Sequence, residues 1–534
     1  MLQAVRIEGL RSLTDTGFID IKPLTILVGE NSSGKSTFLR FFPLLKQSFE
    51  ADTSGPILWS GFVDFGTYRE AHHNKSTGGI NFHFKFHVEE SRDLLGTMPD
   101  PYFFQESFFR RSIFSENIDI TLMIELSENV KETTRVSKIE YEVGDSIVKI
   151  EISENGQISK FEVNSLDILN FGINFIATHI NNRSMLPTII EFNDGKNGLD
   201  LEYRNLFKFR RFQSNLFMKL RSEVKTLSQV RSDEKIEYIT ASLCQSIGSS
   251  EEILQRIKQA HNSKSWQKKT GEWDINNGEF QKIRDLIIAT NLPYLLEDSD
   301  RYIASFSKNI SYVGPARVTA EHRSQRVQEL SVKEIDSQGR NLSLFLRNLD
   351  DTNKQYFDDW TSKYFGFKTV VQSNSGHITL NMFFEENKQE FNIADTGFGF
   401  SQVLPIITQL WFLSQKDKSP RNVATLPIVF AIEQPELHLH PRMQKTLTDV
   451  LVSTVQAAKD NNIDLRLLIE THSEVLVNQV GNLIYKEKIK PEDVNIIVFD
   501  KLPQSNSSTV KTAYYNEEGF LKKWPIGFFD PGVE

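Results

Sequence analysis

The sequence predicts an α/β fold, in which a mixed sheet with flanking helices is interrupted by a long β-then-α insertion. Three observations predict it. An apolar strand at residues 24–28 runs through a glycine-bounded loop into a helix. Two further apolar strands, within 425–441 and 465–476, end at Glu433 and at Thr471-His472-Ser473, respectively. Between these halves, residues 80–162 alternate apolar and polar side chains, as antiparallel strands with one solvated face do.

The loop after the first strand has the spacing of a phosphate-binding loop. Gly29, Gly34, Lys35 and Ser36 fill the pattern G-x-x-x-x-G-K-[ST] between a strand and a helix. The glycines let backbone N–H groups point at phosphate oxygens, Lys35 reaches the β and γ phosphates, and Ser36 ligates Mg²⁺. The start of the helix adds the positive end of its dipole. A chance glycine-rich loop is the alternative, which the ordered flanks disfavour.

We therefore expect a nucleotide and Mg²⁺ to bind here. The expected contact residues are Gly29, Glu30, Asn31, Ser32, Ser33, Gly34, Lys35, Ser36 and Thr37. The helix that follows carries an apolar stripe that should pack on a sheet, and Pro43 within it predicts a kink or an early end.

Composition limits the class of protein. The chain has 534 residues, 61 basic against 70 acidic, and a net charge of -9, so any binding of nucleic acid must be local. No apolar run approaches the roughly 20 residues that span a bilayer, and the N-terminal residues lack the apolar stretch of a signal peptide. The single cysteine, Cys244, excludes an intramolecular disulfide and a Cys-based zinc site. We expect a cytoplasmic protein.

Four parts are expected along the chain. Residues 1–75 and 310–534 form the two halves of the nucleotide-binding head, 76–200 a mainly β insertion, and 201–309 a helical insertion. Within the helical part, residues 263–273 are polar and predict a loop. Two histidines in the β part, His83 and His87, share one face of a predicted strand, where a solvated or partly buried position is preferred to a metal site.

One predicted helix has a basic face. Between Arg204 and Arg231 there are eight basic residues and one acid, and four of the basic residues lie opposite an apolar stripe. Such a face could follow nucleic-acid phosphates or dock an acidic partner, but the solvated face of a packed helix is the preferred reading. The four residues are Arg204, Lys208, Arg211 and Lys219.

The second half of the head supplies three more elements. Gly397, Gly399 and Ser401 precede an apolar helix, which has the form of a second anion-binding helix start. Glu433 ends a buried apolar strand of Walker B type, where a carboxylate can hold the Mg²⁺ shell through water. His472 follows the next apolar strand and can donate a hydrogen bond to the γ-phosphate.

With these motifs in this order, residues 1–75 and 310–534 resemble the ATP-binding-cassette (ABC) ATPases, in the branch of SMC-like, RecF-like and OLD-family heads. The runs EQPELHLHP, TGFGFSQVLP, VGPAR and KKWPIGFFD together resemble a subgroup of bacterial AAA-type ATPases with a DUF3696-like tail. The resemblance implies an ABC-type head that binds ATP. It also implies that Gly399 and Ser401 contact the γ-phosphate held by another protomer, in a homodimer or a higher oligomer.

The sequence departs from the family pattern after Glu433. Cassette ATPases place a catalytic glutamate at the next position, which is Gln434 here. A glutamine orients water but does not accept its proton, and general-base help is typically worth about 10²- to 10⁴-fold. We therefore expect slow hydrolysis, or help from Glu436 or His472, with ATP acting mainly as a dimer-holding switch. Normal hydrolysis is the competing view, because phosphoryl transfer depends largely on positioning.

Two further features are compared with the cassette pattern: the glutamine that senses Mg²⁺ and a pair of histidines after the Walker B strand. The glutamine that senses Mg²⁺ in cassette heads has no counterpart between Gln47 and Gln105; Asp64 and His72 are candidates, although a plain surface loop explains them as well. The pair His438 and His440, just past the Walker B strand, is more consistent with a dimer contact than with a metal site.

The chain shows no recognisable nuclease motif of Toprim or HNH type. Heads of this size resemble the ATPase subunits of Septu-type and retron-associated antiviral systems, which implies a separate HNH-type nuclease and, in retron versions, a reverse transcriptase with its RNA–DNA product. The alternative is a RecF- or SMC-like ATPase that repairs or clamps DNA directly, against which stand the acidic charge and the absence of a heptad repeat. An enzyme activity within the insertion has no support in the sequence.

Overall fold

The computed structural model describes most of the chain. The described residues are 2–73, 78–88, 118–179, 183–192, 214–228, 230–245, 247–315, 325–326, 334–374, 377–386, 388–395, 398–415, 426–501, 507–525 and 528.

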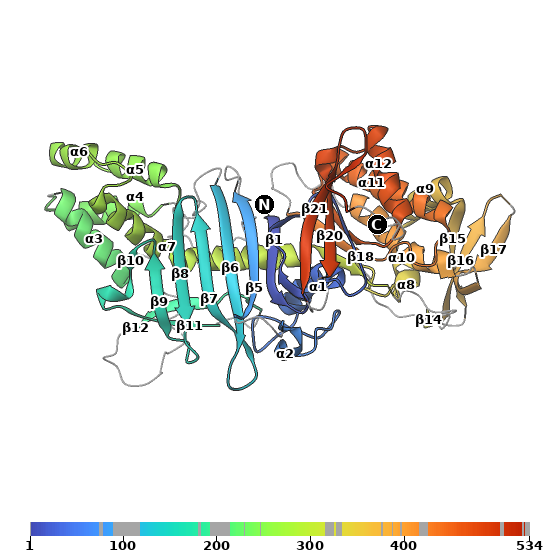
Figure 1. Ribbon diagram of the computed structural model, residues 1–534, viewed down its shortest axis with the longest axis horizontal. Coiled ribbons are helices and arrows are strands. Elements are labelled where there is room, and N and C mark those ends of the chain that lie inside the picture. Colours follow the sequence, from blue (N-terminus) through green and yellow to red (C-terminus); the bar gives the residue numbers. More distant parts are fainter. Residues whose placement is uncertain are drawn as a thin grey trace.

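One large mixed sheet runs through the centre of the molecule (Figure 1). Its strand order is β10-β9-β8-β7-β6-β5-β1-β2-β21-β20-β4-β19-β18-β13. The section from β20 to β13 is parallel, and this is where the apolar strands predicted around the phosphate loop lie. The parallel strands are β20 (Val494–Lys501), β4 (Leu24–Gly29), β19 (Leu465–Glu470), β18 (Ile428–Glu433) and β13 (Ile310–Val313).

The antiparallel section continues the same sheet, because β5 pairs directly with β1. The β part of the insertion therefore extends the sheet of the head. The strands of the antiparallel section are β1 (Leu2–Leu10), which belongs to the head, and β5 (Ile80–Val88), β6 (Ile118–Glu128), β7 (Thr134–Val143), β8 (Ser146–Ile152), β9 (Ile158–Val163) and β10 (Leu166–Asp167). Shorter pieces are β2 (Leu13–Asp15), β3 (Ile19–Asp20), β21 (Ser508–Tyr515) and β22 (Leu521–Lys522).

Helices cover both faces of the parallel section, whose strands are buried on both sides. Leu27 and Leu468 join one hydrophobic core with α1 (Lys35–Glu50), whereas Ile26 and Ile469 face the opposite core. The second core is closed by α10 (Phe398–Gln415), α11 (Pro441–Asp460) and α12 (Glu474–Tyr485). The predicted α/β class, a mixed sheet with flanking helices, is confirmed.

The helix α1 passes through Pro43 and ends at Glu50, so the early end predicted at this proline is wrong. A proline inside a helix removes one backbone hydrogen bond and strains the preceding turn. Burial outweighs that cost, because Phe38, Phe41 and nearly every later residue of α1 are buried between the sheet and its neighbours.

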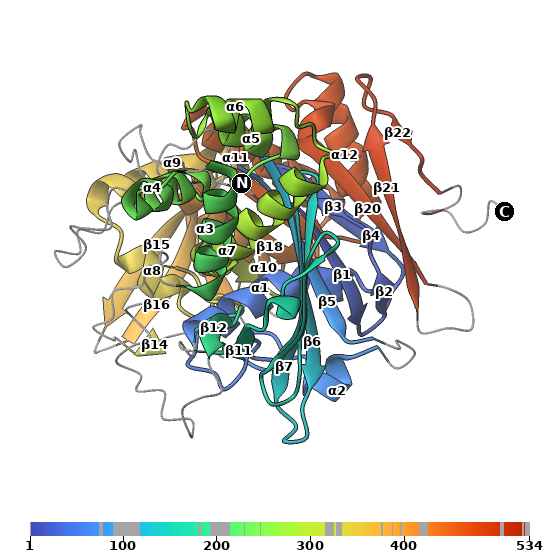
Figure 2. The ribbon, with the colours of Figure 1, turned by 90° about the vertical axis from the view of Figure 1, so that its left-hand side faces the viewer.

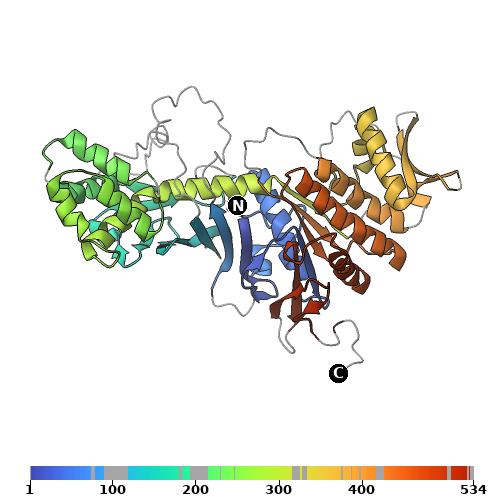
Figure 3. The same ribbon diagram turned by 90° about the horizontal axis from the view of Figure 1, so that it is seen from above.

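The helical part of the insertion forms a lobe at one end of the molecule, which faces the viewer in Figure 2. Its last helix, α7, runs from this lobe along the molecule to the centre (Figure 3) and packs against α1. The helices are α3 (Asn215–Ser228), α4 (Asp233–Leu243), α5 (Ser250–Gln259), α6 (Lys264–Gly271) and α7 (Gly278–Ser307). A small hairpin, β11 (Asn174–Thr178) and β12 (Thr188–Phe192), lies at its base.

The loop predicted at residues 263–273 is wrong, because this segment forms α6. Ser263 caps the helix by accepting a hydrogen bond from the backbone N–H of Trp266 at 3.2 Å. The indole of Trp266 is fully buried and donates to the carbonyl of Ile257 at 2.8 Å. The cap and two buried tryptophans, Trp266 and Trp273, therefore order a segment that is otherwise mostly polar.

A second lobe, not anticipated from the sequence, lies at the other end of the molecule (Figure 1). It combines a small antiparallel sheet with two helices, and it shares the core that contains α10. Its elements are β14 (Gln325–Arg326), α8 (Leu342–Arg347), α9 (Asp351–Phe365), β15 (Phe367–Asn374), β16 (His377–Phe384) and β17 (Gln389–Asn392). The short helix α2 (Tyr68–Ala71) precedes β5.

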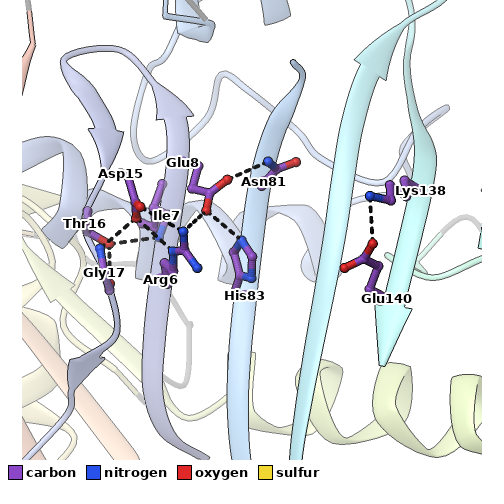
Figure 4. A network of polar contacts seen from close by, with 10 residues as sticks. All are labelled: Arg6, Ile7, Glu8, Asp15, Thr16, Gly17, Asn81, His83, Lys138 and Glu140. Carbon is purple, nitrogen blue, oxygen red and sulfur yellow. Dashed lines mark hydrogen bonds and ion pairs between the residues drawn. The ribbon is translucent and has the colours of Figure 1, made fainter. Parts of the chain in front are cut away.

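The antiparallel section has the predicted solvated face, which carries a polar network (Figure 4). Arg6 donates two hydrogen bonds of 2.8 Å to Asp15 and also pairs with Glu8. His83 lies 3.4 Å from Glu8, and burial lowers its pKa. These contacts join β1 to β2 and β5, and His83 is partly buried on β5, one of the strand positions that the sequence predicted for it.

No helix among the described residues combines the length and the apolar character that a membrane span needs. The division into residues 1–75, 76–200, 201–309 and 310–534 stays a prediction as a statement about domains.

Replacing Phe41 by alanine should destabilise the protein. Its ring lies 4.8 Å from that of Phe82 on β5, so α1 is fastened to the antiparallel section through this contact. Loss of a buried phenylalanine costs about 3–5 kcal/mol, which a shift in the unfolding midpoint would report. Phe62→Ala is the control, because Phe62 is 53% exposed and its loss should cost no more than about 0.5 kcal/mol. Equal effects of the two variants would contradict this role of Phe41.

Candidate nucleotide site

The predicted motifs meet at the carboxyl ends of three neighbouring parallel strands. β4 ends at Gly29, β19 at Glu470 and β18 at Glu433, and Glu433 and Glu470 are direct partners in the strand register. The crevice outside the carboxyl ends of parallel strands is where ligands bind in open α/β sheets.

The two loop glycines are required by their surroundings. Gly29 has φ of +150°, and a Cβ atom there would lie 2.2 Å from the carbonyl oxygen of Phe499. Gly34 has φ of +99°, and its Cβ atom would lie 2.5 Å from the side chain of Leu13. Since Gly34 is the N-cap residue of α1, no side chain caps the helix start, and the first-turn N–H groups face the loop.

Lys35 lies inside the loop. Its ammonium group donates hydrogen bonds to the carbonyl oxygens of Gly29 at 3.0 Å and Glu30 at 2.6 Å. Burial lowers its pKa, against the opposing influence of Glu470 and other nearby carboxylates. Of the remaining loop residues, Ser33 and Thr37 are buried, whereas Glu30, Asn31 and Ser32 form an exposed rim.

Ser36 contacts a residue that the sequence reasoning missed. Its hydroxyl donates a hydrogen bond of 2.8 Å to Oε1 of Glu470, whereas the expected acid was Glu433. Burial raises the pKa of Glu470 to about 7, and the neighbouring Glu433 carboxylate adds to this effect. The sequence does carry a signal for Glu470. This acid ends an apolar strand two residues before His472, just as Glu433 ends the apolar strand that precedes Gln434.

Glu433 is held by residues of its own chain. Arg40 on α1 donates two hydrogen bonds to its carboxylate, at 2.6 and 2.8 Å, and the hydroxyl of Tyr312 on β13 donates a third at 2.8 Å. The pairing raises the pKa of Arg40, and burial followed by the charge of Glu433 raises that of Tyr312. The sequence signal for Arg40 was a lone charge within the apolar stripe of α1.

The loops after β18 and β19 are joined to each other. The backbone N–H of Gln434 donates to the carbonyl of Glu470 at 2.8 Å, and Gln434 has φ of +43°, a conformation that few residues other than glycine adopt. Glu436 accepts a hydrogen bond of 2.8 Å from the backbone N–H of His472. Partial burial and the charge of Lys35 lower the pKa of His472, which favours a neutral imidazole.

The two histidines that follow β18, His438 and His440, have different surroundings. His440 caps α11, because its Nδ1 accepts a hydrogen bond of 3.2 Å from the backbone N–H of Arg442. His438 has φ of +62° within the turn. Across the described part of the chain, no group of three or more His, Cys, Asp and Glu side chains could hold a metal ion.

The predicted signature segment is partly described. Gly397 lies outside the described residues, whereas Gly399 and Ser401 lie in the first turns of α10. A Cβ atom at Gly399 would come within 3.3 Å of the carbonyl oxygen of His438, so α10 starts against the loop that follows Glu433. Ser401 is buried. Contact of this segment with a nucleotide held by a second protomer stays a prediction.

Asp64 and His72, the candidates for the role of the missing Mg²⁺-sensing glutamine, bond to backbone atoms a few residues away. Asp64 accepts a hydrogen bond from the N–H of Gly66 at 2.8 Å, and His72 Nε2 lies 2.7 Å from the carbonyl oxygen of Gly78. Gln47 is buried and bonds to the backbone of Leu58 and of the following turn, which fixes this loop on α1. These contacts are those of an ordinary surface loop.

The predicted basic face is mostly outside the described residues. Arg204, Lys208 and Arg211 belong to a range that the structure does not describe. Lys219 lies on α3, and its ammonium group is 5.0 Å from the ring centroid of Phe171. A cation above an aromatic ring is a packing contact of this lobe.

Strand, phosphate loop and helix, with acids at the ends of the neighbouring parallel strands, define a nucleotide-binding protein of the P-loop class. The family model of the AAA ATPase domain matches residues 1–477, and the chain belongs to this family. The predicted resemblance to AAA-type ATPases is thereby confirmed. None of the curated proteins compared with the chain matches it.

Among solved structures, the chain is similar to SMC head domains. The Smc head of Pyrococcus furiosus, with an extended coiled coil and bound to the C-terminal domain of ScpA, is 10% identical, with 96% of each chain covered and a TM-score of 0.33. The SMC head of Thermotoga maritima is 8% identical, with 96% of this chain and 98% of that chain covered and a TM-score of 0.33.

The residues present fit a nucleotide with Mg²⁺. Two buried oxygen atoms at the site, Ser33 Oγ and Glu470 Oε2, have no hydrogen-bond partner in the described part of the chain, and a bound ligand would satisfy such atoms. The donor set of one hydroxyl and two carboxylates suits Mg²⁺, which prefers oxygen ligands and takes most of the others from phosphate and water. The cation would supply charge neutralisation at the phosphates.

Replacing Glu470 by glutamine should stabilise the ligand-free protein at high pH. The pKa of Glu470 rises from its ordinary value of 4.5 to about 7 on folding, so the wild type loses stability as the pH rises through this window. Each pKa unit is worth about 1.4 kcal/mol. Glu470→Gln should therefore gain about 3 kcal/mol at pH 8 and almost nothing near pH 4.5, as measured by unfolding midpoints.

The control for this measurement is Glu474→Gln, which removes an exposed carboxylate four residues further along the chain. Its effect should stay small at both pH values. A gain for Glu470→Gln that does not change with pH would contradict the raised pKa.

Proposed function

We propose that this chain is an ATP-dependent switch of ABC type, two copies of which pair around two molecules of ATP with Mg²⁺ and control a separate effector nuclease in bacterial antiviral defence. The observation that carries the proposal is the meeting of Lys35, Ser36 and two strand-end carboxylates at the carboxyl ends of neighbouring parallel strands. Membership of the AAA ATPase domain family supports the nucleotide part of it.

The roles follow from the geometry of the loop. Backbone N–H groups of residues 29–37 would cradle the phosphates, and Lys35 would exchange its two loop carbonyls for phosphate oxygens, which bind an ammonium group more strongly. Ser36 would ligate the cation, with Glu433 supplying charge to its outer shell. Neutral His472 would donate a hydrogen bond toward the γ-phosphate.

Slow turnover is part of the proposal. Gln434, in the position of the catalytic glutamate, has an amide that orients water without accepting a proton. The carboxylate of Glu436 already accepts a hydrogen bond from the N–H of His472, which ties it to the neighbouring loop. ATP would therefore persist long enough to hold the dimer together, and the loss of ATP would let the two protomers separate.

The pairing of two heads is proposed from the signature segment. Gly399 and the buried Ser401 begin an apolar helix against the loop that follows Glu433. If the start of α10 faces the nucleotide bound to the second head, then whether that nucleotide is present would affect the loop after Glu433 in the first head.

The effector part rests on the resemblance to Septu-type and retron-associated ATPase subunits and on the lack of a nuclease motif in the sequence. The partners proposed are an HNH-type nuclease and, in a retron setting, a reverse transcriptase with its RNA–DNA product. Direct clamping of DNA would need a basic face, and the described member of the candidate face, Lys219, packs on Phe171. Neighbouring genes for an HNH protein or a reverse transcriptase would favour the effector role.

Single-turnover hydrolysis of labelled ATP with Mg²⁺ tests the switch. The wild type should hydrolyse slowly and show the mass of a dimer in the presence of ATP, whereas Gln434→Glu should be faster by about 10²-fold, the low end of what a general base contributes. Lys35→Ala is the control and should bind no ATP. Fast hydrolysis by the wild type, unchanged in Gln434→Glu, would contradict the proposal and indicate a motor cycle completed by another residue.

A further inference from the structure

We propose that Glu470, rather than the Walker B residue Glu433, is the carboxylate that works with Ser36 to hold the cation of the bound nucleotide. The inference rests on the proposed function, because it assumes that the chain binds ATP with Mg²⁺. It assigns a cation-binding role to the last residue of the strand between the phosphate loop and the Walker B strand.

The first observation is the direct contact between the two side chains. The hydroxyl of Ser36 lies 2.8 Å from Oε1 of Glu470. A hydroxyl that donates to a carboxylate leaves its oxygen lone pairs available to a cation. Mg²⁺ in nucleotide sites is typically held by one or two carboxylates together with phosphates and waters, so a hydroxyl and one acid are a sufficient protein contribution.

The second observation is the unpaired oxygen of the same carboxylate. Glu470 is only 2% exposed, and its Oε2 has no hydrogen-bond partner among the residues that the structure describes. A buried carboxylate oxygen without a partner is costly, and native proteins rarely leave one unsatisfied. A divalent cation beside Ser36 would give this oxygen the interaction that the protein does not provide.

The third observation concerns Glu433, the acid expected at this position. Its carboxylate receives three hydrogen bonds, two from Arg40 and one from Tyr312. The guanidinium group neutralises its charge, so Glu433 has little left to offer a cation in direct contact. Among the described residues Glu470 forms no such ion pair: the charge of Lys35 acts on it, but the ammonium group donates its hydrogen bonds to loop carbonyls.

Strand order gives the same assignment. β19 pairs directly with β4, which leads into the phosphate loop, whereas β18 is one strand further away. Neighbouring strands lie about 4.8 Å apart, so the end of β18 is about 10 Å from the strand that carries the loop. Glu470 is therefore the acid next to Ser36, and Glu433 fastens α1 and β13 to the end of its strand.

The affinity for ATPγS, a slowly hydrolysed ATP analogue, measured with Mg²⁺ and with EDTA, tests this assignment. In the wild type Mg²⁺ should tighten binding. Glu470→Gln should lose at least about tenfold of this gain and keep its affinity in EDTA within about twofold, while Glu470→Asp, which retains the charge, should keep part of the gain. Glu474→Gln is the matched control and should behave as the wild type.

The outcomes separate the two proposals. A wild type that binds no ATPγS in either condition contradicts the proposed function. A wild type that gains from Mg²⁺, with an equal gain in Glu470→Gln, overturns the role of Glu470 alone. So does weaker binding of Glu470→Gln by the same factor in both conditions, because Glu470 would then merely position Ser36. Unfolding midpoints of each variant show whether it is folded.

Discussion

The site depends on how two buried carboxylates are accommodated side by side. Glu433 and Glu470 end neighbouring strands in register, and each is only 2% exposed. Like charges in such surroundings repel one another and are poorly solvated. Arg40 and Tyr312 neutralise and bind the first carboxylate, whereas Ser36 satisfies only half of the second. Because Glu433 is neutralised and Glu470 is only partly hydrogen-bonded, Glu470 stays available to a ligand.

The helix α1 connects this charge arrangement to the rest of the molecule. It contributes Lys35 at its start and Arg40 one turn later, so both cations of the site belong to one rigid element. Further along, Phe41 packs on the antiparallel section, and Lys46 donates to the carbonyl of Ile310 at 2.8 Å and pairs with Glu334. A change at the phosphate loop would therefore act directly on the elements around α1.

The sequence predicted well whatever depends on local pattern. The glycine-bounded loop between strand and helix, the apolar strands around it and the α/β class follow from spacing and periodicity over a few residues, and the structure brings the loops of Gln434 and His472 together. It predicted poorly whatever depends on distant partners. Arg40 and Glu470 have roles because strands far apart in sequence lie side by side, and α6 and the continuation of α1 through Pro43 depend on buried contacts that outweigh local propensity.

The most direct test is a crystal structure of the wild type with ATPγS and Mg²⁺. The account predicts phosphates along the loop of Lys35, the cation about 2.1 Å from Ser36 Oγ with Glu470 beside it, and the pair of Arg40 and Glu433 intact. A nucleotide bound elsewhere would contradict the site itself. A cation held directly by Glu433, with Arg40 displaced, would contradict the assignment of the two carboxylates.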